Sequence, residues 1–242
     1  MALTKVIGAG VGSLTEDLAL SDSDKIKLGA GSDLQLYHDG SHSYIDEVGT
    51  GSLYVRASII RWTNADGSET LGGVDADGGW FLKANNSNAL VIDTNGHVTK
   101  PLQPAFHARP ASNRLNMGTG ASIDMLFGTE VYDQNLDFDG QNGYVFTAPV
   151  TGKYLFTCML VMFAVDKDYD YIETRIATSN RNYQNFIDPG TFAGDANYWT
   201  QTVTAVTDMD ANDTCKIIFA STGGAEQLDI SSMSTFSGAL IC

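Results

Sequence analysis

Short alternating runs of apolar and polar residues, separated by turn residues, follow one another along most of the chain. In the first half these runs occupy 25–28, 34–37, 44–45, 53–55 and 59–62. Alternation with a period of two residues indicates strands that bury one face. The pattern therefore predicts an all-β protein, and it begins after residues 1–24, in which no helix or strand period is sustained.

Four dipeptides in the first half have the composition of tight turns: Asp39–Gly40, Asp66–Gly67, Asp77–Gly78 and Asn95–Gly96. Glycine accepts the positive φ that hairpin turns require, and Asp or Asn before it favours the same geometry. We therefore predict a meander of β-hairpins over residues 25–100. Two prolines within 101–104 favour an extended linker after it.

A single copy of this predicted meander has too few large apolar side chains to build a core of its own. We expect three copies to wrap about one axis, which would pair strand edges and bury their Leu, Ile, Tyr and Trp faces. His38 and His42 flank the first turn, so in such a trimer they would ring the axis and hold a metal ion. The alternative is that both are polar residues beside an exposed turn.

The second half has longer alternating runs in which aromatic residues recur at strand-length intervals. Their spacing follows a pattern of Phe, Asn or Asp, and Gly-x-Tyr-x-Phe, carried by Phe127, Asp133, Phe138, Phe146, Gly152, Tyr154 and Phe156. One extra residue precedes Phe146, and Cys158 replaces a final aromatic. This pattern resembles the globular head of complement component one, subcomponent q.

The resemblance also covers a first strand at 104–109 and a closing strand at 234–241. It implies a sandwich of the ten-stranded jelly-roll type over residues 105–242. It further implies association as a threefold homotrimer, an architecture shared with the tumour-necrosis-factor cytokines.

Residues 22–58 and 89–98 resemble a recurring module of tail- and head-fibre proteins from marine bacteriophages, and residues 1–6 resemble virion-attachment ends of such fibres. This resemblance implies a docking arm at 1–24 that binds virion tail or capsid proteins. It also implies synthesis in the host cytoplasm, a final location on the virion surface, and a host cell-surface glycan or protein as partner.

Composition and charge limit the kinds of partner that we expect for this protein. With 14 Lys and Arg against 29 Asp and Glu, the formal net charge is -15, which disfavours nucleic acid as a partner. No apolar run approaches the roughly 20 residues that span a bilayer, so we expect no membrane insertion. Cys158 and Cys215 are interpreted as small apolar strand residues.

One acidic stretch in the second half has the residue types that bind metal ions. Asp166, Asp168 and Asp170 alternate, and in a loop their carboxylates would suit calcium; the alternative is a solvated acidic loop. We expect no other cofactor. No nucleophile motif lies between a strand and a helix, so we expect no catalysis.

Segments 180–186 and 191–199 combine aromatic rings with amide side chains, a combination that suits sugars. Arg181, Tyr183 and Asn185 are the predicted receptor-binding residues. The alternative is that Tyr198 and Trp199 begin a core strand and that the Asn-rich segment is a connecting loop.

These observations predict a trimeric virion fibre whose C-terminal head attaches to a host surface. One alternative is a capsid or tail decoration protein without receptor binding. The others are a small polysaccharide depolymerase and a soluble cytokine-like or complement-like ligand, which the missing secretory signal and collagen-like stem disfavour.

Overall fold

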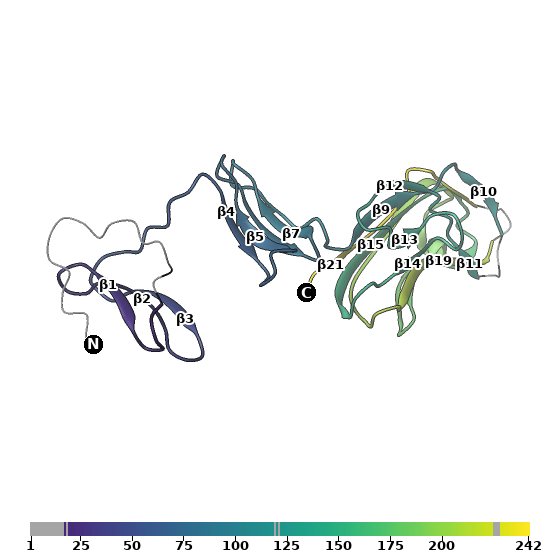
Figure 1. Ribbon diagram of the computed structural model, residues 1–242. Coiled ribbons are helices and arrows are strands. Elements are labelled where there is room, and N and C mark those ends of the chain that lie inside the picture. The colour runs from purple at the N-terminus through teal and green to yellow at the C-terminus, as the bar shows by residue number, and fades with distance from the viewer. Residues whose placement is uncertain (1–16, 18, 119, 121, 225–227) are drawn as a thin grey trace, which may run out of the picture. The chain divides into compact units, whose positions relative to one another are not determined.

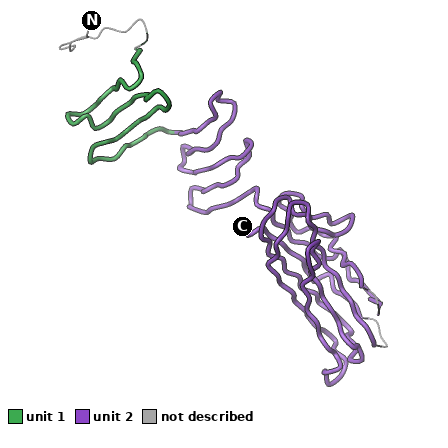
Figure 2. Tube along the Cα trace, turned by 90° about the horizontal axis from the view of Figure 1, so that it is seen from below, with its two compact units in different colours: residues 1–58 green, residues 59–242 purple. Residues whose placement is uncertain are grey.

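The computed structural model describes residues 17, 19–118, 120, 122–224 and 228–242. The chain divides into two compact units, Met1–Ser58 and Ile59–Cys242 (Figure 2). The boundary between the two units falls inside residues 25–100, which the sequence pattern predicts as one hairpin module. Most of the predicted docking arm, at 1–24, lies outside the described residues.

The first unit contains a three-stranded antiparallel sheet (Figure 1), made of β1 (Lys25–Leu28), β2 (Leu34–His38) and β3 (Ser43–Glu47). Asp39 and Gly40 form the predicted turn between β2 and β3. Gly40 has a φ of +96°, and Asp39 Oδ1 accepts hydrogen bonds from the backbone N–H groups of Ser41 and His42, both at 2.8 Å.

The predicted strand at 53–55 is wrong. These three residues are exposed and irregular, between the end of β3 at Glu47 and the next strand at Ile60. Alternation alone does not make a strand, because the backbone N–H and C=O groups need a neighbouring strand to pair with, and none lies beside this segment.

The second unit begins with a five-stranded antiparallel meander in which each strand pairs with the next. Its strands are β4 (Ile60–Thr63), β5 (Thr70–Val74), β6 (Trp80–Ala84), β7 (Ser87–Ile92) and β8 (Val98–Thr99). Gly67, Gly78 and Gly96 lie in three of the connecting turns with φ values of +72°, +92° and +87°. The structure therefore confirms the turns that the dipeptides predict.

The rest of the second unit, called the head below, is a sandwich of two antiparallel sheets, which confirms the predicted all-β jelly-roll class. The seven-stranded sheet contains β9 (Ala105–Arg109), β10 (Arg114–Met117), β12 (Thr129–Asp133), β15 (Gly152–Val165), β18 (Ala196–Met209), β20 (Leu228–Ile230) and β21 (Thr235–Leu240). The six-stranded sheet contains β11 (Ser122–Asp124), β13 (Phe138–Asp139), β14 (Val145–Thr147), β16 (Tyr169–Thr178), β17 (Asn182–Ile187) and β19 (Thr214–Gly223).

β15 is central to the head, because it pairs with β18 on one side and with β21 and β20 on the other. One short 3-10 helix, η1 (Pro189–Thr191), connects β17 to β18. In the described part of the chain, no helix has the length and apolar character needed to cross a membrane.

Aromatic rings fill the space between the two sheets of the head. Phe106 stacks on Phe138 and Phe146, with ring centroids 4.6 and 5.2 Å apart. The predicted core residues Phe127, Phe146, Tyr154, Phe156 and Phe236 are all fully buried.

The two cysteines predicted as apolar strand residues, Cys158 and Cys215, are also fully buried. Burial raises the pKa of both thiols, because the charged thiolate is poorly solvated there. They therefore act as small apolar groups of the core.

Candidate functional site

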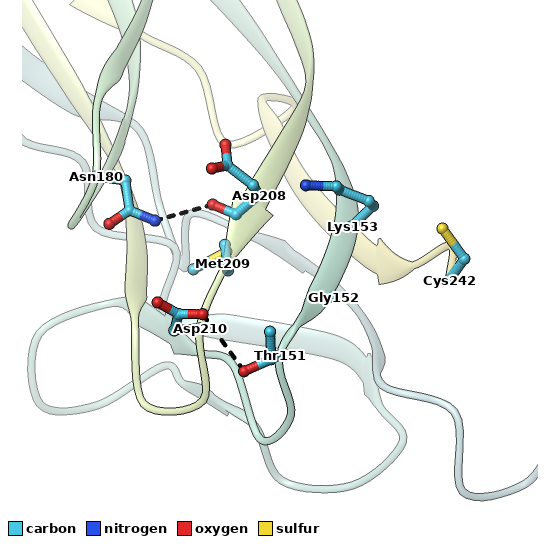
Figure 3. A pocket seen from close by; sticks show the side chains of 8 residues that line it. All are labelled: Thr151, Gly152, Lys153, Asn180, Asp208, Met209, Asp210 and Cys242. Atoms are coloured by element: carbon cyan, nitrogen blue, oxygen red, sulfur yellow. Dashed lines mark hydrogen bonds between the residues drawn. The ribbon is translucent and has the colours of Figure 1, made fainter.

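The turn that carries Arg181 lies beside a shallow pocket at one end of the head. The pocket has a volume of about 440 Å³ (Figure 3) and is lined by Thr151, Gly152, Lys153, Asn180, Asp208, Met209, Asp210 and Cys242. Asn180 Nδ2 donates to the backbone oxygen of Asp208 at 3.0 Å, and Arg181 Nη2 pairs with Asp208 Oδ2 at 2.9 Å.

This pocket is at the end of the sandwich where the linker joins the head, called the linker end below. The backbone N–H of Lys153 donates to the oxygen of Cys242 at 2.7 Å, and the N–H of Leu240 donates to the oxygen of Pro104 at 3.0 Å. Gln134 Nε2 also donates to the backbone oxygens of Lys100, Pro101 and Gln103, at 2.7 to 3.0 Å. These bonds hold residues 100–104 against the head at this end.

Tyr183 and Asn185 belong to β17, and the structure turns both of them away from the Arg181 pocket. They occupy the half-buried positions of an alternating strand. Tyr183 packs against the core, and Asn185 Nδ2 donates to the backbone oxygen of Thr202 at 2.7 Å. Tyr183 and Asn185 hold β17 against the neighbouring β18. Of the three predicted receptor residues, only Arg181 therefore has a half-exposed polar group at the pocket. Receptor binding by this trio stays a prediction.

Segment 182–187 is a strand, so the connecting loop considered for this Asn-rich stretch is wrong. The alternation of outward and inward side chains, Asn182 to Ile187, pairs in register with β16. The polar outward residues gave the segment a loop-like composition, but a strand at a sheet edge carries polar residues on its exposed face.

The predicted calcium residues surround the turn between β15 and β16. Asp166 Oδ1 accepts from the backbone N–H of Asp168 at 2.8 Å, and the carboxylate of Asp168 pairs with Lys167 Nζ. This pairing raises the pKa of Lys167. Among the residues that the structure describes, no three His, Cys, Asp or Glu side chains are grouped so as to hold a metal ion. Asp166, Asp168 and Asp170 are therefore not brought together as ligands within one chain.

His38 and His42 are both exposed in the first unit. His38 ends β2, where alternation places it on the same face as Leu34 and Leu36, and its Nδ1 lies 3.2 Å from Ser43 Oγ. His42 lies in the turn, with its ring 6.4 Å from that of Tyr44. Only His38 therefore belongs to the apolar face of this sheet.

At the end of the head opposite the linker, called the far end, an exposed aromatic ring stands beside a small hollow. β15 ends and β18 begins here, with Phe163 paired to Tyr198. Tyr198 is 71% exposed, and its ring meets that of Phe163 edge-to-face at 5.1 Å. Phe163, Ala164, Asn197 and Tyr198 line a hollow of about 360 Å³.

The backbone at this hollow is held in an uncommon conformation. Ala164 has a φ of +52°, which few residues other than glycine adopt without cost. The adjacent turn is closed by the backbone N–H of Lys167, which donates to Asp195 Oδ1 at 3.0 Å. The open ring face of Tyr198 and the Asn197 amide together provide the stacking and hydrogen-bonding groups that sugar ligands use.

Sequence reasoning named the segment containing Asn197 and Tyr198 but missed Phe163. The two aromatic residues are separated along the chain by β16, β17 and η1, and only the register of β15 with β18 places them together. Trp199, next along the chain, turns inward and packs against Phe192 at 4.8 Å, so the predicted strand at Tyr198 and Trp199 is confirmed, although Tyr198 itself is exposed.

The outer face of the seven-stranded sheet carries no charged residue over the central part of three neighbouring strands. The outward residues of this central part are Leu155, Thr157, Met159 and Val161 on β15, Thr200, Thr202, Thr204 and Val206 on β18, and Thr235, Ser237 and Ala239 on β21. Charges return at both ends of this central part: Lys153 is paired in register with Asp208 at the linker end, and Asp229 of β20 is paired in register with Phe163 at the far end. For a chain with a formal net charge of -15, this neutral face is an unusual surface.

The solved structures that are similar to this chain include the following two. The globular domain of zebrafish complement 1qA protein has 18% sequence identity and a TM-score of 0.41, and the match covers 58% of this chain and 98% of that one. Murine APRIL has 11% identity and a TM-score of 0.42, with 57% and 99% of the two chains covered. No protein-family model matches the chain, and no curated protein sequence matches it.

Proposed function

We propose that this protein is a homotrimeric fibre of a bacteriophage virion, and that its head attaches the virion to a glycan or protein on the host surface. Residues 1–24 would bind tail or capsid proteins. The proposal rests on the fibre-like sequence of the first hundred residues and on the exposed aromatic hollow at the far end of the head.

Self-association is supported by the neutral face of the seven-stranded sheet. Association of like-charged chains is opposed by repulsion, so a surface without charge is the one that copies can bury against each other at the lowest electrostatic cost. Leu155 and Val206 pair across β15 and β18 on this face and are 40% and 58% exposed. Burying them against a copy would remove apolar surface from water without desolvating an ion.

Attachment is supported by the far end, and Tyr198 is the single observation that carries it. This end lies opposite the linker, so a receptor can reach it without displacing residues 100–104. Three such sites, held at fixed spacing in a trimer, would bind a repeating surface glycan with an avidity well above the affinity of each.

The test is binding of the labelled full-length protein to an array of bacterial surface polysaccharides, with Tyr198→Ala as the variant. We expect about tenfold weaker binding, corresponding to about 1.4 kcal/mol of lost stacking. Tyr54→Ala is the matched control, because Tyr54 is 74% exposed in the other unit and its loss should leave binding unchanged. Arg181→Ala tests the candidate surface at the linker end in the same assay.

Each other outcome points to a named alternative. Binding to purified capsid or tail components, with none to polysaccharide or whole cells, would replace attachment by a decoration role. Release of reducing ends from a bound polysaccharide would identify a depolymerase. Equal binding by the wild type and Tyr198→Ala would remove the far-end hollow as the site.

A further inference from the structure

The central part of one face of the five-stranded meander, β4 to β8, consists only of apolar residues and glycine. Strand register and alternation place nine residues on it: Ile60, Trp62, Gly72, Val74, Trp80, Leu82, Leu90, Ile92 and Val98. We call this set the meander face. Trp62, Trp80 and Leu82 are 47%, 52% and 54% exposed, and the two indole rings lie 6.4 Å apart.

Gly72 lets the large side chains close over the middle of the meander face. A Cβ at this position would lie 3.0 Å from Leu82 Cδ2 and 3.3 Å from Trp62 Cε3. The two side chains from the neighbouring strands therefore meet above the glycine, and they form one continuous apolar surface.

The opposite face of the same sheet is already covered by its own charged side chains. The guanidinium of Arg61 lies 5.0 Å from the ring centroid of Phe81, and Lys83 Nζ lies 5.7 Å from it. Arg61 also donates to the oxygen of Val74 at 2.8 Å and pairs with Asp75. Phe81 is the one large side chain of the described meander that is buried, at 9% exposure, so the sheet lacks a core on either side.

The three-stranded sheet of the first unit has the same division between its faces. Ile26, Leu28, Leu34, Leu36 and Ile45 share one face, with His38 and Glu47 towards its ends. On the other face Tyr37 and Tyr44 stack at 4.7 Å, Lys25 Nζ lies over Tyr37 at 3.7 Å, and Tyr37 donates to Asp46 at 2.8 Å. Two separate sheets thus have one face whose polar groups are paired and one face that is mainly apolar and open.

We infer that the meander face packs against the same face of further copies of this chain. A partner that recognised this acidic protein by charge would use its carboxylates, whereas another copy with the same net charge needs an uncharged surface. Burying the exposed halves of two indole rings alone removes roughly 200 Å² per chain, and with the other apolar side chains the face approaches the ~800 Å² per partner of a stable interface. The inference rests on the proposed self-association and adds a second interface to it, apart from the head.

Val98 and Thr99 provide a matched pair of variants for the test. They are adjacent on the edge strand β8, both are exposed, and their side chains point to opposite faces. Val98→Glu puts a charge on the meander face, and Thr99→Glu puts it on the opposite face. Neither change removes a buried contact within one chain.

Hydroxyl-radical footprinting of the full-length protein, read by mass spectrometry, reports the exposure of Trp62 and Trp80 directly. We expect both to be protected in the wild type and in Thr99→Glu, and to be labelled at least fivefold faster in Val98→Glu. Trp199 in the head serves as the internal reference, and its labelling should not change.

An oligomeric wild type whose two tryptophans are labelled equally fast in all three proteins would overturn the meander interface and leave head association intact. A monomeric wild type by light scattering would overturn both. Protection that is lost in both variants would show that the sheet is merely destabilised by added charge, and it would also overturn the inference.

Discussion

Individual side chains of the head separate into those that hold the fold and those that are free to bind. Phe156 is fully buried and lies within 5.3 to 6.4 Å of the rings of Phe146, Phe106, Phe236 and Tyr154. Tyr198, at the far end, has one ring neighbour and an open face. Substitutions at the two residues should therefore affect different properties.

Phe156→Ala should lower the free energy of unfolding by roughly 3 to 5 kcal/mol, because it removes buried apolar surface and leaves a cavity. The measurement is urea unfolding at one fixed protein concentration. Phe186→Ala, at an exposed aromatic position, is the control and should cost less than about 1 kcal/mol. A similar loss for both variants would contradict the core assignment.

Glu173 gives the head a pH dependence that one substitution can isolate. Burial acts to raise the pKa of its carboxyl, but hydrogen bonds from Arg175 at 2.6 and 2.9 Å and from Gln184 at 2.7 Å outweigh burial and lower the pKa below the ordinary 4.5. Because the pKa of Glu173 is lowered in the folded state, the Glu173–Arg175 pair stabilises the head above pH 4.5. This stabilisation is lost as pH falls through the folded-state pKa.

Glu173→Gln should therefore cost roughly 3 kcal/mol in unfolding free energy at neutral pH, because it leaves the largely buried Arg175 without its counter-ion. The difference from the wild type should narrow as pH falls below 4.5. Urea unfolding of both proteins across this pH range measures the difference in unfolding free energy. A difference that stays constant with pH would show that the ion pair is not its source.

At the scale of elements, close packing between strands depends on one glycine in β21. Gly238 lies in register with Phe156 on one side and Phe106 on the other. A Cβ there would lie 2.5 Å from Phe156 Cδ1 and 2.6 Å from Phe106 Cε1. The two rings cross over the glycine, so the strand needs the missing side chain for the aromatic core to close.

Gly238→Ala should destabilise the head by about 1 to 3 kcal/mol through overpacking. Gly194→Ala is the matched control, because no heavy atom lies within 4 Å of its added Cβ. Thermal unfolding of the two variants and the wild type measures this loss of stability as a difference in melting temperature. Equal melting temperatures for both would mean that the rings move aside at no cost.

Turns and strands could be predicted from the sequence where the residues that determine them are neighbours along the chain. The Asp–Gly and Asn–Gly turns lie where the dipeptides predicted them, because a positive φ is a property of those residues alone. The segment 53–55 failed because a strand needs a partner, and the pairing of Phe163 with Tyr198 was missed because register over two 14-residue strands depends on packing along their whole length. The inward turn of Tyr183 and Asn185 was missed for the same reason.

For the whole molecule, the division of surfaces into charged and uncharged faces points to assembly. The head has a neutral outer sheet face, and both hairpin sheets have one apolar face, in a chain with a formal net charge of -15. Composition alone indicated that the hairpin region lacked a core. Which residues form each face required the strand register, which composition does not contain.

The mass of the full-length protein in solution, by size exclusion with light scattering, tests the central claim of self-association most directly. The account predicts a mass close to three times 25.9 kDa, stable on dilution to micromolar concentrations. A stable species of 25.9 kDa under the same conditions would contradict it, because a single chain would then tolerate in water the neutral face of the head and the mainly apolar faces of the two hairpin sheets.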